Sequence, residues 1–277
     1  MSNKLYDRNK TTENNISKEH LDFLHKIKRR KHAILTTQIA CFIFFFLFWE
    51  ISARMKWVDT FLTSYPSQMW TMFLKLIQDG SLPNHVGISA FSTVAGFVSG
   101  TILGTIVAIL LWWSDFIAKV LDPYMIILNA LPKTALAPII ILWAGAGIAG
   151  IVFTAMAISI VVTILGVYGG FKEVDGEKVK MLEAFGATKL QILNKVIIPA
   201  SIPTIVNALK INVGLSWVGV IVGEFIVSRA GIGYLIVYGS QVFRMDLVMT
   251  SVFILAVLAA LMYQGVAFLE SKLMKWR

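Results

Sequence analysis

The sequence predicts an all-α polytopic membrane protein with about six transmembrane helices and a helical loop on the cytoplasmic side. Of its 277 residues, 57% are hydrophobic and 15% are charged, and the mean hydropathy is +0.73. These values are too apolar for a soluble domain of this length. The apolar residues gather into six separate stretches, and a long polar segment, 170–203, interrupts them.

The six apolar stretches define the expected spans. A helix rises about 1.5 Å per residue and the hydrocarbon core is about 30 Å thick, so a span needs about 20 mostly apolar residues. We place the spans at 33–53, 86–111, 123–144, 147–169, 204–228 and 247–269. Residues 33–269 then form one transmembrane domain between tails at 1–32 and 270–277. We expect no removable signal peptide, because the first tail is polar throughout.

The positions of lysine and arginine predict the orientation of the chain. With the N-terminus inside, 18 of the 25 basic residues fall in inner segments and only five fall in outer ones. Cytoplasmic loops carry such an excess of basic residues. Both ends of the chain and segment 170–203 are therefore expected in the cytoplasm.

The second expected span carries small residues at strict four-residue spacing. These residues are Ser92, Gly96, Gly100, Gly104 and Ala108. Because residues four apart share one face of a helix, the spacing lines that face with small side chains. The pattern predicts close packing against another helix and no chemistry.

Residues 66–80 have the pattern of a short amphipathic helix. Apolar residues are expected on one face, namely Met69, Met72, Phe73, Leu76 and Ile77, with Lys75 and Gln78 opposite. A helix of this kind lies along the outer membrane interface rather than spanning it.

The residues give no support for an enzyme, a metal site or a nucleic-acid-binding protein. The only cysteine, Cys41, lies in an apolar run, and the four histidines, His20, His25, His32 and His85, lie outside the expected spans without clustering. There is no GxxxxGK[ST] sequence, so no phosphate-binding loop is expected. The net charge of +9 comes from basic residues beside apolar segments rather than from a basic groove with aromatic residues.

Segment 170–203 has the pattern of one or two short helices lying on the membrane surface. After Gly186 the apolar residues Leu190, Leu193, Ile197 and Ile198 recur at helical spacing. Gly186 allows a bend, and Pro199 and Pro203 are expected to mark the turn into the fifth span. Such a surface is suited to docking another protein, whereas a solvated connector is the alternative.

The same segment resembles the permease subunits of bacterial ABC importers. Their loop signature has a glycine followed 13 positions later by a proline, which Gly186 and Pro199 match, with Val196, Ile197 and Ile198 before the proline. The upstream half of the signature departs from the pattern at Lys180 and Leu182. The resemblance extends to the nitrate, taurine and alkanesulfonate branch through YPSQMW near 65–70, ISAFSTVAGFVSGTILGTIVA at 88–108, LNALPKTALAPIIILWAGAG at 128–147, GVIVGEFIVSRAGIGYLI at 219–236 and the ending FLESKLMKW.

The resemblance implies a division of labour among several subunits in the bacterial cytoplasmic membrane. Two permease chains, expected to be copies of one another in a homodimer, would form the pore. Two ABC ATPase subunits would bind ATP and Mg, and an extracytoplasmic binding protein would deliver a small solute. The chain itself would be no enzyme and would hold no cofactor. We expect the ATPase to dock on what we call the docking segment, residues 183–191, through Glu183, Phe185, Gly186, Ala187, Thr188, Lys189, Leu190 and Gln191.

Polar groups within the spans are the candidates for the substrate pathway, because an ionisable side chain there costs on the order of 2.5–3.5 kcal/mol. Lys133, beside Pro132, either turns toward an anionic substrate or snorkels to the cytoplasmic interface. Glu224 either makes a structural hydrogen bond or interchain contact or binds substrate. The further candidates Asn129, Asn207, Asn212, Ser216 and Trp217 serve either the pathway or helix packing.

The resemblance points to a sulfonate, taurine or nitrate as the solute, with a thiamine-precursor-like or other heterocyclic nutrient as the alternative. An ion-coupled secondary carrier is the rival from another class. Such carriers show related halves and paired intramembrane charges. We find no internal repeat, and the two intramembrane charges are too sparse for an ion relay.

Overall fold

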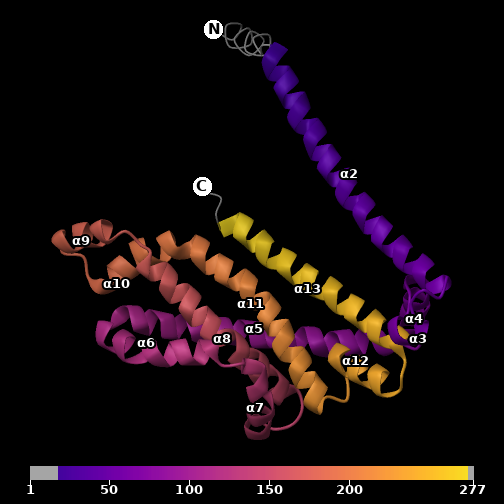
Figure 1. Ribbon diagram of the computed structural model, residues 1–277. Helices are drawn as coiled ribbons and strands as arrows, with labels where there is room; N and C mark the ends of the chain where they lie inside the picture. The colour runs from indigo at the N-terminus through magenta and orange to yellow at the C-terminus, as the bar shows by residue number, and fades with distance from the viewer. Residues whose placement is uncertain (1–17, 274–277) are drawn as a thin grey trace, which may run out of the picture. The chain divides into compact units, whose positions relative to one another are not determined.

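The computed structural model describes residues 18–273, and every regular element in that range is a helix (Figure 1). The larger helices are α2 (Lys18–Arg54), α4 (Pro66–Gln78), α5 (Ser81–Trp113), α6 (Asp115–Ala130), α7 (Ala137–Ala144), α8 (Ile148–Lys172), α9 (Gly176–Ala184), α11 (Ile198–Val227), α12 (Ile232–Gln241) and α13 (Met245–Leu273). The short ones are α3 (Thr60–Thr63), the 3₁₀ helix η1 (Lys133–Leu136), α10 (Lys189–Ile192) and the π-helical turn η2 (Leu193–Ile197). The chain divides into two compact units, which are described separately.

The first unit comprises α2 and the start of α4. Helix α2 begins well before the expected first span, so part of the tail at 1–32 is helical, while residues 1–17 lie outside the described residues. At the other end of α2 the Glu50 carboxylate accepts hydrogen bonds from the Ser67 backbone N–H at 3.0 Å and from the Ser67 hydroxyl at 2.8 Å. Arg54 donates to the same carboxylate at 2.7 Å. A charged group thus ties the end of α2 to the first turn of α4.

Five described helical segments are long and apolar enough to cross a membrane, and the broken pair α6 and α7 makes a sixth if the two helices count as one span. Five of the expected spans are therefore found as continuous helices, whereas the third is not a single helix. Helix α6 ends at Ala130, and the chain bends by 89° before it continues through η1 and α7. Pro132 lies in the break, where its missing N–H and restricted backbone do not favour a continuous helix.

The core of the second unit is a three-helix contact between α5, α8 and α11. The small-residue stripe of α5 faces α8 as expected: a Cβ added at Gly96 would lie 2.5 Å from the Ala155 Cβ, and one at Gly104 would lie 2.7 Å from the Thr163 Cβ. The same α8 residue meets α11, since a Cβ at Gly219 would lie 2.5 Å from the Ala155 Cα. Larger side chains at these positions would separate the helices, so the small residues permit the close packing.

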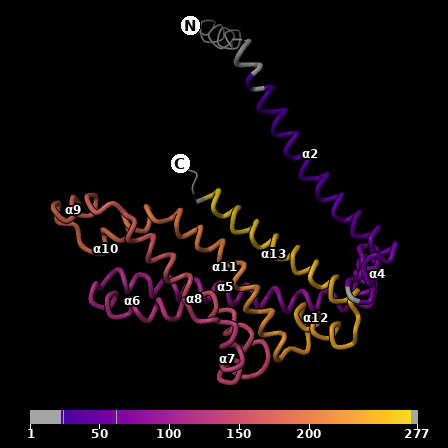
Figure 2. Tube along the Cα trace, in the orientation of Figure 1, coloured from indigo at the N-terminus to yellow at the C-terminus, as the bar shows by residue number. Residues whose placement is uncertain are grey.

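The ends of these helices define two ends of the unit. Figures 1 and 2 show α9 and α10 at one end of α8 and α11, and α12 at the other. We refer to them as the α9–α10 end and the α12 end. Helix α5 begins at the α12 end, because Gly231 at the start of α12 donates to His85 near the start of α5 at 2.9 Å.

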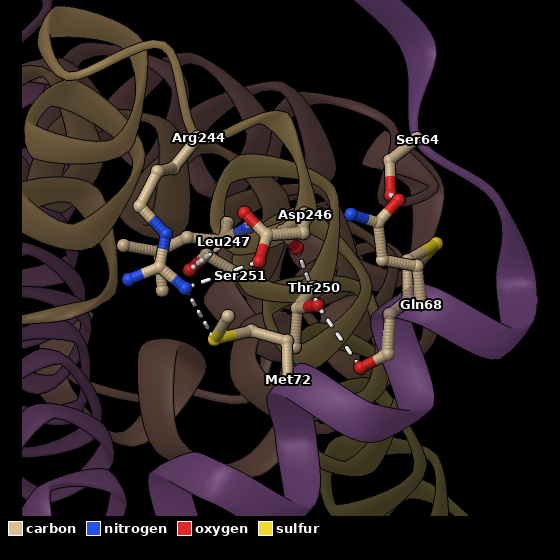
Figure 3. Close-up of polar contacts among 9 residues, drawn as sticks. Ser64, Gln68, Met72, Arg244, Asp246, Leu247, Thr250 and Ser251 are labelled. Atoms are coloured by element: carbon tan, nitrogen blue, oxygen red, sulfur yellow. Dashed lines mark hydrogen bonds and ion pairs between the residues drawn. The ribbon is translucent and has the colours of Figure 1, made fainter. Parts of the chain in front are cut away.

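Helix α4 packs against α13 at the α12 end (Figure 3). The Thr250 hydroxyl donates to the Met69 carbonyl at 3.2 Å. The Arg244 guanidinium donates to the Asp246 carboxylate at 3.1 Å and lies 3.5 Å from the Met72 sulfur. The expected apolar face is present, with Met69, Met72 and Leu76 buried and Phe73 partly buried. Ile77 is an exception: it is exposed, because it lies on the side of the helix that carries Trp70 and Leu74.

The two prolines at the start of the fifth span do not mark a turn, contrary to expectation. One helical segment runs from Lys189 to Val227 through α10, η2 and α11. The π-helical turn immediately before Pro199 closes with a bond from the Ile198 N–H to the Leu193 carbonyl. A local π turn lets a helix accommodate residues that break the ordinary pattern, so the chain continues past both prolines.

Candidate functional site

The docking segment connects two short helices through a tight turn at the α9–α10 end. Asp175 is the N-cap of helix α9, and its side chain accepts a hydrogen bond from the Glu177 N–H at 2.9 Å. An acidic side chain at this position satisfies a free N–H group and complements the helix dipole. Of the one or two short helices expected around Gly186, the structure has two, α9 and α10.

Helix α9 ends in a Schellman motif in which Gly186 has a φ of +75°. The Gly186 N–H donates to the Glu183 carbonyl at 2.9 Å, and the Ala187 N–H donates to the Leu182 carbonyl at 3.0 Å. Leu182 and Ala187 also pack on the same apolar cluster. This hydrogen-bond pattern with glycine in the left-handed conformation is a common way to end a helix. The bend expected at Gly186 is confirmed.

Helix α10 begins with a capping box formed by Thr188 and Gln191. The Gln191 side chain accepts from the Thr188 N–H at 2.7 Å, and the Thr188 hydroxyl accepts from the Gln191 N–H at 3.4 Å. The reciprocal bonds satisfy two N–H groups that the helix leaves free. Both residues were expected on the docking surface, and in this structure their side chains serve the segment's own fold.

Three large apolar side chains of this region are exposed on the surface of the chain. Met181 and Leu190 are each 55% exposed and Phe185 is 80% exposed. We call these three residues the apolar knob. Glu183 and Lys189 are also exposed beside it. Solvent-exposed apolar side chains gathered within ten residues, with charges around them, are typical of an interaction surface.

The opposite side of the segment is embedded in an apolar cluster. Its buried members are Ala108, Val167, Phe171, Ile192, Leu193 and Ile197, and its partly buried members include Val174, Val179, Leu182 and Ala187. The cluster joins α5, α8, α9 and α11. The apolar knob is therefore carried on a packed base rather than on a loose loop, which counts against the solvated-connector alternative.

Lys189 makes a contact that the sequence pattern did not indicate. Its ammonium donates to the Trp113 carbonyl at the end of α5 and lies 5.7 Å from the ring centre of Trp112 and 5.6 Å from that of Trp113. The tryptophan pair was visible in the sequence at the end of the second span. Its partner was not, because the two positions are 76 residues apart.

The pathway candidates fall into three separate places rather than one. Asn129 and Asn207 line a pocket of about 340 Å³ between α6, α8 and α11, together with Thr204. The Lys133 ammonium donates to the Asn129 backbone carbonyl at 3.0 Å, at the end of α6. This contact places a cation at a helix C-terminus, where it is favourable.

Asn212 and Ser216 lie inside the three-helix core and not in this pocket. Both are completely buried, and the Asn212 amide donates to the Thr163 hydroxyl on α8. The Asn212 carbonyl oxygen and the Ser216 hydroxyl have no hydrogen-bond partner among the described residues. Polar groups between helices commonly hold those helices together in a membrane. Their surroundings favour packing over the pathway.

Glu224 lies near the α12 end of α11, where it holds the start of α12. Its carboxylate accepts hydrogen bonds of 2.6 Å from the Ser89 hydroxyl and from the Gly233 N–H. The Ser89 hydroxyl in turn accepts from the Ile232 N–H at 2.7 Å. Gly231 has a φ of +124°, and a Cβ there would overlap the Glu224 carboxyl group. The carboxylate is 1% exposed, so these contacts support the structural alternative.

Sequence reasoning missed Ser89, Thr163 and His85 as partners of these groups. His85 was expected outside the spans, but it lies within α5 and accepts from Gly231; His25 and His32 likewise lie within α2. The helices extend beyond their apolar windows, which explains the error. Among the described residues no three His, Cys, Asp or Glu side chains come together as a metal site.

Comparison with known proteins assigns the family. Residues 100–275 match the model of the binding-protein-dependent transport system inner membrane component. The chain belongs to this family. It is a permease subunit of an ABC importer and not an enzyme, and ATP hydrolysis belongs to a separate ATPase subunit.

Individual relatives agree with the family. Over 230 residues the chain is 30% identical to the permease protein SsuC of Bacillus subtilis, which is named for aliphatic sulfonates transport; the match covers 83% of each chain. It is 27% identical over 236 residues to the formylaminopyrimidine transport permease protein ThiX of Halalkalibacterium halodurans, covering 85% of this chain and 94% of the relative.

The fold is similar to that of solved ABC transporter permeases. An inward-facing structure of the MetNI methionine ABC transporter contains a chain with a TM-score of 0.61 and 19% identity, and the match covers 68% of this chain and 94% of that chain. At this identity the likeness concerns the fold alone. It agrees with the predicted class, a polytopic helical membrane protein.

Proposed function

We propose that this permease imports a small organic anion, with the sulfonate class as the first candidate. The observation that carries the proposal is the 30% identity over 83% of each chain to a relative named for aliphatic sulfonates transport. The pocket lined by Asn129, Thr204 and Asn207 offers amide and hydroxyl donors, which suit the oxygens of a sulfonate. Lys133, at the break in the third span, adds a positive charge near that pocket.

The docking segment is the proposed binding surface for the ATPase. The apolar knob would enter a groove of that subunit, with Glu183 beside it, while the capping box and the Schellman motif keep the segment in one conformation. Rigid, exposed apolar side chains make good anchors because little conformational entropy is lost when they bind. Closure of two ATPases on ATP binding would then move two permease chains between outward-open and inward-open states.

The family description, which names a binding-protein-dependent transport system, supports two further parts of the proposed assembly. A binding protein would deliver the solute at the α12 end, and a second copy of this chain would complete the pore. The distribution of lysine and arginine supports a cytoplasmic location for both ends of the chain and for the docking segment.

Transport in proteoliposomes tests the substrate. The chain is purified with its ATPase and binding protein, and uptake of a labelled alkanesulfonate is measured with ATP, with ADP and without the binding protein. ATP-dependent uptake that requires the binding protein supports the proposal. Uptake driven by an ion gradient without ATP would support the secondary carrier instead.

A heterocyclic nutrient is the second candidate, and the 27% identity to a formylaminopyrimidine permease favours it. The same proteoliposomes separate the two candidates by competition. The heterocycle would be favoured if an excess of unlabelled formylaminopyrimidine abolished sulfonate uptake. It would also have to be transported faster than the sulfonate.

A further inference from the structure

The α9–α10 end contains a direct contact between the docking segment and the junction of α5 and α6. Helix α5 ends at Trp113, and its last carbonyl groups lack partners within the helix. The Ser114 N–H satisfies the Leu110 carbonyl, and the Lys189 ammonium donates to the Trp113 carbonyl. A cation at this position also complements the negative end of the helix dipole.

The positive charge of Lys189 does not stabilise its own helix, α10, which indicates that its role lies in the contact with α5. Lys189 is the first residue of α10, where a positive charge opposes the dipole of its own helix. Its ammonium instead lies over the end of α5, 5.7 Å from the ring centre of Trp112 and 5.6 Å from that of Trp113. The cation–π interaction with the two indole rings further stabilises this contact.

Helix α6 starts immediately after this contact. Ser114 caps α6 by accepting a hydrogen bond from the Ile117 N–H at 3.3 Å. Along α6, Ala118 and Met125 are buried in an apolar cluster with residues of α5 and α8. The turn at 113–115 is the covalent link from α5 into α6, and α6 carries Asn129 to the pocket.

We propose that Lys189 is a positioning residue that transmits movement of the docking segment to α6 and the pocket, through the Trp113 carbonyl and the turn at 113–115. This role rests on the proposed docking of an ATPase. The apolar cluster beneath the segment supplies separate anchoring. Loss of the lysine is therefore expected to weaken transmission without unfolding the segment.

The test compares Lys189→Met with Lys180→Met in the complete complex of permease, ATPase and binding protein. Methionine keeps an unbranched side chain and removes the charge. Lys180 is an exposed lysine of α9 for which the structure records no ion pair or ring contact, so it is a matched control. ATP hydrolysis and solute uptake are measured in the same proteoliposomes.

We expect Lys189→Met to bind the ATPase normally, to keep most of the hydrolysis and to lose at least threefold in solute taken up per ATP hydrolysed. Lys180→Met should keep the wild-type ratio, and Lys189→Arg should restore most of it because arginine can also bond the carbonyl and stack on the rings. An unchanged ratio in Lys189→Met would overturn the role. Loss of ATPase binding would also overturn it and would make Lys189 a docking residue.

A distance measurement gives a readout independent of transport. Spin labels are placed at Phe116 on α6 and at Lys178 on α9, both exposed, after Cys41 has been replaced. In the wild-type background, ATP should shift both labelled helices together, so that the distance distribution between them stays narrow; in Lys189→Met it should broaden. A wild-type complex without ATP-dependent uptake would instead overturn the proposed function, and this role with it.

Discussion

Glu224 on α11 accepts a 2.6 Å hydrogen bond from the backbone N–H of Gly233, the second residue of α12. A carboxylate at a helix N-terminus is well placed to satisfy the free N–H groups there. The carboxylate also accepts from Ser89 on α5, so one side chain connects three helices at the α12 end.

Replacing Glu224 by alanine should therefore lower stability rather than remove a substrate contact. Two donors, the Ser89 hydroxyl and the Gly233 N–H, would lose their acceptor in a buried site, at a cost of about 1–3 kcal/mol each. We expect a lower apparent melting temperature in detergent and reduced yield, with a smaller deficit for Glu224→Gln, which keeps an acceptor oxygen. An alanine variant that melts like the wild type but does not transport would point to substrate binding.

The small-residue stripe of α5 predicts a difference between two glycines on one helix. A Cβ at Gly104 would lie 2.7 Å from the Thr163 Cβ, whereas one at Gly87 would meet nothing within 4 Å. Overpacking of a close helix contact costs about 1–3 kcal/mol. Gly104→Ala should lower the apparent melting temperature, and Gly87→Ala should leave it unchanged. Equal effects would contradict the close packing of α5 on α8.

A comparison of Gly186 with Gly176 distinguishes the effect of backbone conformation from the effect of steric crowding by an added side chain. Neither has an atom within 4 Å of an added Cβ, but only Gly186 has a positive φ. A β-branched residue in that conformation costs on the order of 1–3 kcal/mol, which would change the turn between α9 and α10. Gly186→Val should insert into the membrane normally but lose ATP-driven uptake, and Gly176→Val should transport. Normal uptake by Gly186→Val would refute the docking argument.

Phe185 and Phe116 test the apolar knob. They are 80% and 77% exposed, on the docking segment and on α6 respectively, so neither contributes much to the fold. Truncating an anchor residue of an interface costs about 2 kcal/mol, roughly a thirtyfold loss of affinity. Phe185→Ala should lose ATPase in copurification, whereas Phe116→Ala should retain it. Equal retention by both variants would remove the apolar knob from the interface.

Two asparagines of α11 are expected to differ in the kind of defect they cause. Asn207 lines the pocket and is exposed, whereas Asn212 is buried and donates to Thr163. Asn207→Ala should raise the KM for uptake several-fold at unchanged melting temperature, because a donor to the solute is lost. Asn212→Ala should lower the melting temperature by leaving the Thr163 hydroxyl without its donor, a loss of about 1 kcal/mol. The reverse pattern would place the pathway in the three-helix core.

Much of the fold was predictable from local patterns. Hydropathy located the five continuous spans, although the first and fifth helices begin well before their apolar windows. The four-residue repeat of small side chains identified the packing face of α5, and Gly186 marked the bend of the docking segment. The errors concerned proline, which can either break a helix or lie within one. Pro132 accompanies a break, while Pro199 and Pro203 lie in a continuous helix behind a π turn.

The candidate site was predictable as a segment but not as a set of roles. Thr188 and Gln191 were identified by position, yet they cap α10, and Lys189 reaches the end of α5. The pathway candidates were selected one at a time because each is polar within a span. Polarity within a span does not predict which of these side chains line the same pocket.

The amino-acid sequence determined the apolar spans, their approximate positions and the family, because apolar length, small-residue spacing and turn residues are properties of one continuous segment of the chain. Only the tertiary structure decided that Glu224 meets Ser89, that Lys189 meets Trp113 and that Asn129 shares a pocket with Asn207. Each of these contacts depends on the rotation and relative height of separate helices. In lipid, apolar surfaces satisfy many such arrangements equally well, so close packing and a few polar contacts select among them.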